Sequence, residues 1–279
     1  MMLNGFYIDE LIKTAIKEDI SYFDAATDSL LNPDENGKAY YLAKADGVLC
    51  GLTIALRVFE LLDSSFHAQV FKNDGDEIKK GDIIAELFGK TAMLLKGERT
   101  SLNVLQHMSG IATATAQAVK LVEGTNVQIT DTRKTLPGLR ALEKYAVTCG
   151  GGKNHRFNLS DGAMLKDNHI DAAGGITKAV EAVRGKLGHM IRIEVETRNL
   201  DEVKEALSAG VEIIMLDNMT NEEMKKAVEL TAGRAKLEAS GGITAENLRS
   251  VAETGVDIIS LGALTHSVKA FDISMKISK

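Results

Sequence analysis

Polar and glycine residues follow a series of short apolar runs in the second half of this 279-residue chain. The runs end near Asp131, Lys166, Glu196, Asp217, Ser240 and Gly262. Arg133 and Lys134 come just after the first run, so cations would meet carboxylates wherever these ends converge. A pair of carboxylates without His or Cys at ligand spacing suits Mg²⁺, a hard ion often held through a substrate's phosphates. The pattern favours a site for a small polyanion.

Two of the run ends carry glycine, in ASGGI (239–243) and SLGAL (260–264). In βα barrels the loops after the final two strands often hold a phosphate, because glycine N–H groups and a helix N-terminus point at the anion. The glycines favour a phosphorylated ligand, although two ordinary turns before helices would look the same. Glu196 and Asp217 have a similar alternative, a structural ion pair with a nearby lysine or arginine. Because both carboxylates follow neighbouring strands, the pair favours a functional site over a structural ion pair.

The elements that must position these residues are strands alternating with helices. Segments such as GGITKAVEAVRG and NEEMKKAVELTAG separate the apolar runs, and the later run ends (196, 217, 240, 262) lie 21, 23 and 22 residues apart. That spacing fits one strand, one helix and two short loops. An open doubly wound sheet would share it, but polar or glycyl strand ends favour a barrel, where strand C-termini converge on one mouth. Six strands are evident, and one or two more are expected within 137–160.

The first half of the chain predicts a separate, smaller α/β unit. Ile8, Leu11, Ile12 and Ile16 form one apolar stripe of a helix. Strands and hairpins are expected over 38–50 and 66–88, and helices over 52–62 and 91–122, the last interrupted at Ser109 and Gly110. The predicted divisions are an N-terminal α/β sandwich domain (1–110), an α/β barrel (111–270) and a C-terminal tail (271–279).

Composition excludes several other classes of protein. The formal net charge of −6 disfavours a general nucleic-acid binder, although residues 131–169 hold seven basic against four acidic side chains. No uncharged apolar run approaches the roughly 20 residues that span a bilayer. The N-terminus lacks the positive region of a signal peptide, so a cytoplasmic protein is expected. Cys50 and Cys149, without a CxxC pattern, predict two buried thiols rather than a disulfide framework or a thiolate metal site.

Several segments together resemble a known family. They are DTRKTLPGLRALEKYAVTCGGGKNHRFNLSDGAMLKDNHI (131–170), GERTSLNVLQHMSGIAT (97–113), IEVE (193–196), IMLDN (214–218), EASGGI (238–243) and GVDIISLGALTHS (255–267). In this order they are similar to the quinolinate phosphoribosyltransferases, which make nicotinate mononucleotide for NAD biosynthesis. The resemblance covers most of the chain. It implies an N-terminal α/β sandwich followed by an incomplete α/β barrel of about seven strands.

The resemblance also implies roles for individual residues. A cationic pocket for the pyridine dicarboxylate would comprise Arg133, His155, Arg156 and Lys166, with Arg99 supplied by the second subunit of a homodimer or of a larger assembly. Such a pocket suits carboxylates, because guanidinium groups bind them through paired, charge-assisted hydrogen bonds. The implied catalytic residues are Lys134 and Lys166 for phosphoribosyl pyrophosphate, and Glu196 and Asp217 for the ribose hydroxyls and Mg²⁺. The other implied substrate-binding positions are Thr132, Leu261 and, around the 5′-phosphate, Ser240, Gly241, Gly242, Gly262 and Ala263.

The implied reaction needs no protein nucleophile. The ring nitrogen of quinolinate would attack C1 of the ribose as pyrophosphate leaves, and the adjacent carboxylate would then depart as CO₂. Lys166 or His155 is the candidate to assist at that carbon. The chain departs from the family pattern at EDISYFDAATD (18–28), where a glycine-containing loop is usual.

Three alternatives remain open from the sequence. A related enzyme could keep the fold and take a different anionic acceptor, as the molybdenum-associated members do. A Schiff-base aldolase could use Lys166, although a nucleophilic lysine must be held as the neutral amine by burial or by cationic neighbours. A non-catalytic sensor of phosphoribosyl ligands is the third, which loss of Glu196 or Asp217 would favour, yet both are present.

Overall fold

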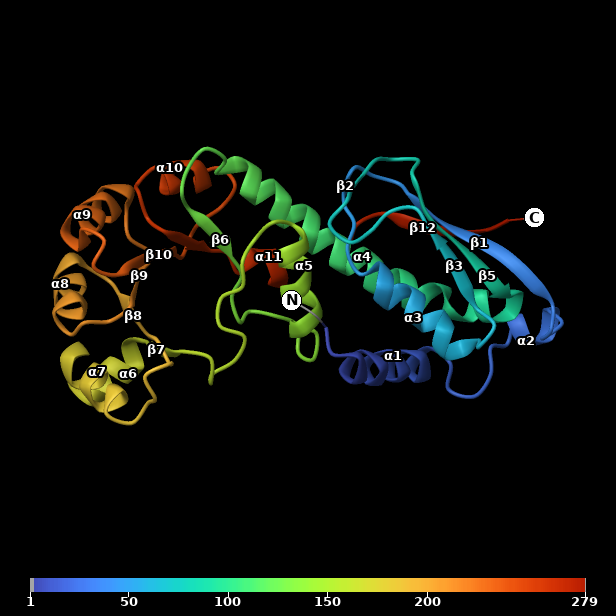
Figure 1. Cartoon of the computed structure of the whole chain (residues 1–279), viewed down its shortest axis with the longest axis horizontal. Helices are drawn as coiled ribbons and strands as arrows, with labels where there is room; N and C mark the ends of the chain where they lie inside the picture. The colour runs from blue at the N-terminus through green and yellow to red at the C-terminus, as the bar shows by residue number, and fades with distance from the viewer. Residues whose placement is uncertain (1–2, 279) are drawn as a thin grey trace. The chain divides into compact units, whose positions relative to one another are not determined.

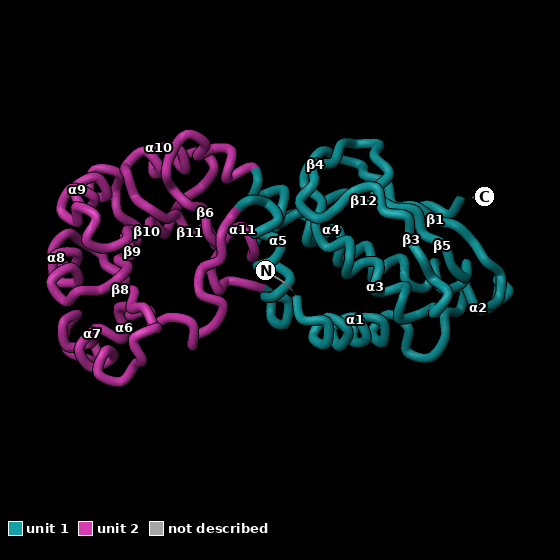
Figure 2. Tube along the Cα trace, in the orientation of Figure 1, with its two compact units in different colours: residues 1–116, 136–151, 267–279 teal, residues 117–135, 152–266 magenta. Residues whose placement is uncertain are grey.

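The computed structural model describes residues 3–278 and forms two compact units (Figure 2). Of the described residues, unit 1 comprises 3–116, 136–151 and 267–278, and unit 2 comprises 117–135 and 152–266. The predicted tail at 271–279 therefore lies, as far as it is described, in unit 1, where residues 273–278 form a strand. Among the described residues, no helix is both long enough and apolar enough to cross a membrane.

Unit 1 is built on an antiparallel sheet of four strands in the order β12-β1-β5-β3. The strands are β1 (Asn36–Ala43), β3 (His67–Val70), β5 (Ile83–Lys90) and β12 (Ile273–Ser278), and a small second sheet pairs β2 (Gly47–Val48) with β4 (Glu77–Ile78). β12 pairs with β1 along its whole length, from Lys38 opposite Ser278 to Ala43 opposite Ile273. The chain segment after unit 2 thus completes the sheet that begins the chain.

Two helices bury the apolar face of this sheet, α3 (Leu52–Leu62) and the first part of α4 (Thr91–Leu121). Unit 1 also contains α1 (Gly5–Asp19), which packs on α3, together with α2 (Thr27–Leu30) and α5 (Arg140–Cys149). One cluster joins Tyr41 of β1, Phe59 of α3, Leu87 of β5 and Leu105 of α4, all fully buried or nearly so. The sequence-based expectation of an N-terminal α/β sandwich is confirmed, including the bounds of the helix at 52–62.

The predicted interruption of α4 at Ser109 and Gly110 is wrong, because the helix runs continuously through both residues (Figure 1). Ser109 Oγ accepts a hydrogen bond from the Cys50 N–H at 3.0 Å and donates one to the Cys50 carbonyl at 3.1 Å. A Cβ on Gly110 would lie 2.4 Å from the Lys269 carbonyl oxygen. The two small residues let other chain segments approach the helix; they do not break it.

Unit 2 is a parallel sheet of six strands in the order β6-β11-β10-β9-β8-β7. The strands are β6 (Gln128–Thr130), β7 (Ala163–Leu165), β8 (Ile193–Thr197), β9 (Ile213–Asp217), β10 (Lys236–Ser240) and β11 (Ile258–Ser260). From β7 to β11 neighbours follow chain order, and β6 joins beyond β11. This is the rotary order of a barrel, whereas a doubly wound sheet reverses direction at a switch point.

The barrel is incomplete, as expected. Beyond β6 the only further pairing in the described chain is a single parallel bridge between Thr130 and Lys153. The segment expected to hide one or two extra strands contains helix α5 instead. The sheet therefore has one open side, between this bridge and β7.

Each of the strands β7 to β11 leads through a loop into a helix. The helices are α6 (Asp167–Ala173), α7 (Ile176–Arg184), α8 (Leu200–Ser208), α9 (Asn221–Thr231), α10 (Leu248–Ala252) and α11 (Ala263–His266), and Figure 1 shows α7–α10 along the outer side of the sheet. Capping explains where two of them begin. Asn199 accepts from the N–H groups of α8, and Thr220 forms a capping box with Glu223 at the start of α9. The loops between strand and cap then hold the polar residues.

Candidate active site at the carboxyl ends of the parallel strands

The predicted strand-end residues gather at the carboxyl ends of the unit 2 strands. Lys166 follows β7, Glu196 lies near the end of β8, and Lys166 Nζ donates to Glu196 Oε2 at 2.8 Å. The two side chains are 49% and 15% exposed, respectively. Because the lysine end of this ion pair is half exposed, the pair contributes little to stability, and Lys166 can exchange Glu196 for a ligand at small cost.

Asp217 ends β9 and lies beside Ser240, its partner in the parallel register with β10. Asn218 takes a left-handed backbone conformation (φ 54°) directly after it and donates from Nδ2 to Asp217 Oδ2 at 2.9 Å. A Cβ on Gly241 would lie 2.3 Å from Asn218 Oδ1, and Gly241 itself has φ +91°. The loop after β9 approaches the loop after β10 so closely that only glycine fits at position 241.

The backbone N–H groups of Gly241 and Gly242 donate no hydrogen bond within residues 3–278. Both glycines have positive φ, at 91° and 62°. Successive N–H groups in a turn can bind an anion. The phosphate site expected at 240–242 stays a prediction.

Lys134 and Gly262 form a second close approach. The Lys134 N–H donates to Thr132 Oγ1 at 3.0 Å, and the Lys134 carbonyl accepts from Thr265 Oγ1 at 2.7 Å. A Cβ on Gly262 would lie 2.9 Å from Lys134 Cδ. The lysine stem therefore crosses the β11 loop, where Leu261 is buried and Ala263 begins α11.

The loop that carries His155 and Arg156 is fastened to the end of β6 by Asp131. The fully buried Asp131 carboxylate accepts from the His155 N–H at 2.9 Å and from Asn154 Nδ2 at 2.6 Å. Arg156 Nη1 donates to the Gly162 carbonyl at 2.9 Å. Burial lowers the pKa of Arg156, and the positive charge of Arg133 lowers it further.

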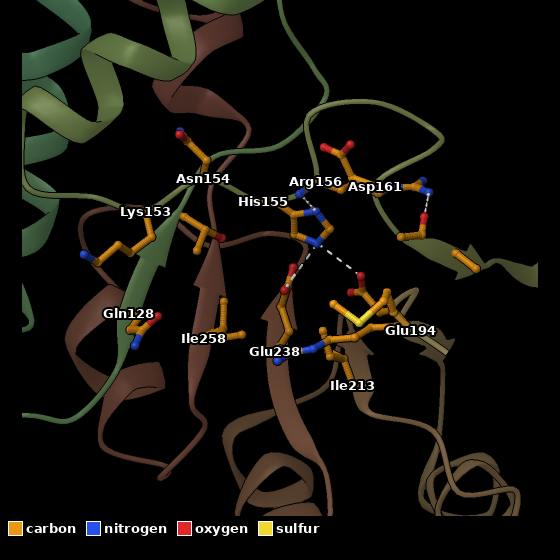
Figure 3. A pocket seen from close by; sticks show the side chains of 15 residues that line it. Gln128, Lys153, Asn154, His155, Arg156, Asp161, Glu194, Ile213, Glu238 and Ile258 are labelled. Carbon is orange, nitrogen blue, oxygen red and sulfur yellow. Dashed lines mark hydrogen bonds and ion pairs between the residues drawn. The ribbon is translucent and has the colours of Figure 1, made fainter. Parts of the chain in front are cut away.

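The imidazole of His155 points toward two buried glutamates (Figure 3). Its Nε2 lies 3.2 Å from Glu194 Oε2 and 3.4 Å from Glu238 Oε2. Burial alone would lower the pKa of His155, but hydrogen bonds and charge interactions with the two glutamates raise it to about 10. Burial and the Glu238 charge also raise the pKa of Glu194.

Nδ1 of His155 lies 2.8 Å from the Arg156 N–H, so Nε2 is the ring nitrogen that donates toward the two glutamates. The raised pKa of His155 keeps Nε2 protonated at neutral pH.

Figure 3 shows the cavity of about 350 Å³ that this group lines. Its lining includes Gln128, Ala163, Ile213 and Ile258, each the first residue of its strand. Of the predicted site, only His155 and Arg156 reach it. The cavity thus lies toward the amino ends of the strands, while the other predicted site residues of unit 2 lie at the carboxyl ends, where barrels collect their chemistry.

Arg99 lies in unit 1, on helix α4, with an exposed side chain. The structure contains one chain, and the predicted role of Arg99 across a dimer interface stays a prediction.

Sequence reasoning missed Glu194, Glu238 and Asn218 as members of the site region. The signal for the glutamates was strand alternation, because residues two positions apart on a strand share a face. Glu194 precedes Glu196 by two positions, and Glu238 precedes Ser240 by two. The strand ends alone indicate Glu196 and Ser240. They do not indicate Glu194 and Glu238, which lie one layer deeper on the same strands.

The donor set at the carboxyl ends fits Mg²⁺ held largely by a substrate. Glu196 and Asp217 offer only carboxylate oxygens, the ligands of a hard cation. In the described chain neither belongs to a group of three His, Cys, Asp or Glu ligand atoms within 4.8 Å of one another. Two protein carboxylates alone would leave most of the coordination to water and phosphate oxygens.

Comparisons with known proteins cover the whole of this architecture. Residues 24–109 match the model of the quinolinate phosphoribosyl transferase N-terminal domain, and residues 111–276 match that of the C-terminal domain. This chain belongs to the quinolinate phosphoribosyltransferase family. The sequence-based resemblance is confirmed, and so is the fold class.

Relatives within the family are similar over nearly the full length. A Bacillus subtilis protein, the probable nicotinate-nucleotide pyrophosphorylase [carboxylating], is 46% identical over 99% of this chain and 95% of its own. A Synechocystis protein of the same description is 45% identical over 97% of this chain and 92% of its own. The crystal structure of NadC from Streptococcus pyogenes superposes with a TM-score of 0.96 at 44% identity, covering 100% of this chain and 99% of that one.

Proposed function

We propose that this quinolinate phosphoribosyltransferase family member transfers the phosphoribosyl group from phosphoribosyl pyrophosphate to quinolinate. The products are nicotinate mononucleotide, CO₂ and pyrophosphate, a step of de novo NAD biosynthesis. The observation that carries the proposal is the arrangement at the strand ends: Lys166 beside Glu196 at 2.8 Å in a chain that matches both family domains. We extend the proposal to a cytoplasmic location and to Mg²⁺ as cofactor.

Lys134 and Lys166 bind the pyrophosphate, since both are exposed ammonium groups at the carboxyl ends of the strands. Gly241 and Gly242 donate their N–H groups to the 5′-phosphate. Glu196 and Asp217 accept hydrogen bonds from the ribose hydroxyls. Mg²⁺, bound by these carboxylates and by the substrate, would offset negative charge on the departing pyrophosphate.

Transfer begins when the quinolinate ring nitrogen attacks C1 and the C1–oxygen bond to pyrophosphate breaks. Positive charge develops on the ribose, and the Glu196 carboxylate stabilises it. Preorganised charges of this kind usually supply the largest part of catalysis. Arg133 and Arg156 hold the two carboxylates of the acceptor.

Loss of CO₂ then leaves an electron pair at the ring carbon, which must take up a proton. The Lys166 ammonium is half exposed and carries a transferable proton. His155 is turned toward Glu194 and Glu238 and is committed to them. Of the two candidates from the sequence, the geometry therefore favours Lys166 as the proton donor.

The same geometry disfavours the aldolase alternative. A Schiff-base lysine requires burial or cationic neighbours that hold it as the amine. Lys166 instead contacts a carboxylate and is half exposed. Retention of both Glu196 and Asp217 likewise disfavours a non-catalytic sensor.

The decisive test is an assay with quinolinate, phosphoribosyl pyrophosphate and Mg²⁺ that follows nicotinate mononucleotide and CO₂ together. Equal release of both products, with nicotinic acid inactive as acceptor, is the expected result. Turnover of nicotinic acid, or no turnover of quinolinate by folded protein, would contradict the proposal and favour an enzyme with another acceptor.

We further propose that the active form is a homodimer in which Arg99 completes the partner's acceptor site. Mixed dimers of Arg99→Ala and Lys134→Ala chains then recover part of the activity, because one of the two sites is intact. Neither parent variant is active alone. No recovery in dimers shown to be mixed would exclude a shared site.

A further inference from the structure

Three segments far apart in the sequence meet within unit 1 at Cys50, Asp74 and Cys149. Cys50 lies just before α3, Asp74 lies in the loop between β3 and β4, and Cys149 ends α5. One ligand atom from each, two sulfurs and a carboxylate oxygen, lie within 4.8 Å of one another. The sequence predicted two buried thiols without a metal site, because their separation along the chain hides this convergence.

Each of the three side chains is held in place by its own contacts. The backbone of Cys50 is fixed by the pair of hydrogen bonds with Ser109 of α4, at 3.0 and 3.1 Å. Asp74 Oδ1 accepts from the Leu52 N–H at 2.9 Å, and Oδ2 accepts from the Tyr145 hydroxyl at 3.1 Å. Cys149 is fixed by its place in the last turn of α5. The cluster is preorganised.

The cluster offers a cation soft and hard donors together. Burial raises the pKa of the fully buried Cys50, so its sulfur is a neutral thiol without a cation. A bound divalent cation favours the thiolate, because a thiol that coordinates such an ion loses its proton.

We propose that Cys50, Cys149 and Asp74 bind a thiophilic divalent cation, zinc foremost, as a site separate from the barrel. Around tetrahedral zinc, with Zn–S of about 2.3 Å and Zn–O of about 2.0–2.2 Å, ligand atoms lie roughly 3.5–3.8 Å apart. The observed separations, all within 4.8 Å, need only small side-chain movements to reach this. Water occupies the fourth position.

A cavity in unit 1 reaches the cluster at Asp74. It has a volume of about 390 Å³, and both Asp74 and Tyr145 line it. Tyr145 acts on the ion through Asp74, whose second oxygen it orients. Partners of this kind in the outer shell are worth about 10–100-fold in metal affinity.

The bound ion would tie the start of α3, the 73–76 loop and the end of α5 to one another. It would stabilise unit 1 and take no part in the chemistry at the barrel strands. The proposal is independent of the transferase activity, and its test does not use that activity.

The test is titration of the reduced full chain with Co²⁺ and then Zn²⁺, in the presence of excess Mg²⁺. Because the chain has only two cysteines, a thiolate-to-cobalt charge-transfer absorption can come only from Cys50 and Cys149. We expect one equivalent of cobalt per chain with this absorption, its displacement by zinc, and a higher thermal midpoint with zinc bound.

Matched variants assign the ligands. Cys149→Ser and Cys50→Ala should abolish the absorption, and Asp74→Asn should weaken binding while keeping the acceptor for the Leu52 N–H. Tyr145→Phe should weaken zinc binding by about tenfold or more. Circular dichroism of each metal-free variant checks that it is folded.

Two results would overturn the proposal. One is cobalt or zinc binding that persists unchanged in the cysteine variants, which would place it at His155, Glu194 and Glu238, the other group of potential ligands in the described chain. The other is oxidation of Cys50 and Cys149 to a disulfide in the native protein with no metal bound after reduction, which would assign the pair to redox chemistry.

Discussion

Strand β8 carries two glutamates that lie two residues apart, on one face of the strand, and meet opposite environments. Glu196, near the carboxyl end, contacts the half-exposed Lys166. Glu194, one layer deeper, is 5% exposed and contacts His155 together with Glu238. The two positions on one strand therefore have different roles. Glu196 can exchange its partner for a substrate, whereas the buried Glu194 cannot.

The largest difference should appear in stability when the cation is removed from the inner layer (His155, Glu194 and Glu238) or from the outer layer (Lys166 and Glu196). His155→Ala leaves two buried carboxylates without their partner and should lower the free energy of unfolding by about 3–5 kcal/mol. Lys166→Ala breaks an exposed pair and should cost less than about 1 kcal/mol. Denaturant unfolding at pH 7, followed by circular dichroism, measures both. Equal losses would mean that the two layers do not differ as described.

The two glutamates should differ in the opposite sense in catalysis. Glu196→Gln removes charge stabilisation at the reacting ribose and should lower kcat about 10²–10³-fold, the range for loss of one preorganised group. Its unfolding free energy should stay near that of the parent chain. Glu194→Gln is the control at the same spacing and should keep most of kcat in folded protein. A similar loss of kcat in both would contradict the separation.

The inner layer should also give stability a pH dependence. The pKa of His155 is raised from 6.5 to about 10 in the folded chain. Its contribution to stability is therefore complete below about pH 6.5 and is lost as the pH rises toward 10. The difference in unfolding free energy between the parent and His155→Gln should shrink over this range. A difference that stays constant from pH 6 to 10 would refute the assignment.

A smaller effect should appear at the outer layer, in the phosphate loop. Gly241→Ala places a Cβ 2.3 Å from Asn218 Oδ1, in addition to the strain of φ +91°. We expect KM for phosphoribosyl pyrophosphate to rise roughly tenfold, about 1.4 kcal/mol. Gly210→Ala is matched, because it has φ +71° and nothing within 4 Å of the added Cβ. Gly210→Ala should lower the free energy of unfolding through backbone strain and leave KM for phosphoribosyl pyrophosphate unchanged.

The outer layer could be predicted from the sequence because strand ends are marked by a change from apolar to polar residues. That change predicts Lys166, Glu196, Asp217 and Ser240 at one end of the sheet. The inner layer could not be read in this way, since Glu194 and Glu238 stand within apolar runs. Their stability depends on His155, which a loop brings from a distant part of the sequence.

The same limit applies to the first half of the chain. Periodicity identified the helix at 52–62, but Ser109 and Gly110 looked like a break in α4. Small residues permit either a bend or a close approach, and only the neighbours decide which one occurs. The neighbours here are Cys50 and Lys269, far from α4 in sequence. The convergence of Cys50 with Cys149 was hidden for the same reason.

The pairing of β12 with β1 has a consequence for the order of synthesis. β1 leaves the ribosome early, whereas β12 follows every strand of the parallel sheet. Throughout the synthesis of unit 2, one side of β1 therefore remains an open sheet edge, the kind of surface that recruits strands from other chains. The nascent protein is most exposed to mispairing near its beginning, and that exposure ends only when residues 273–278 arrive.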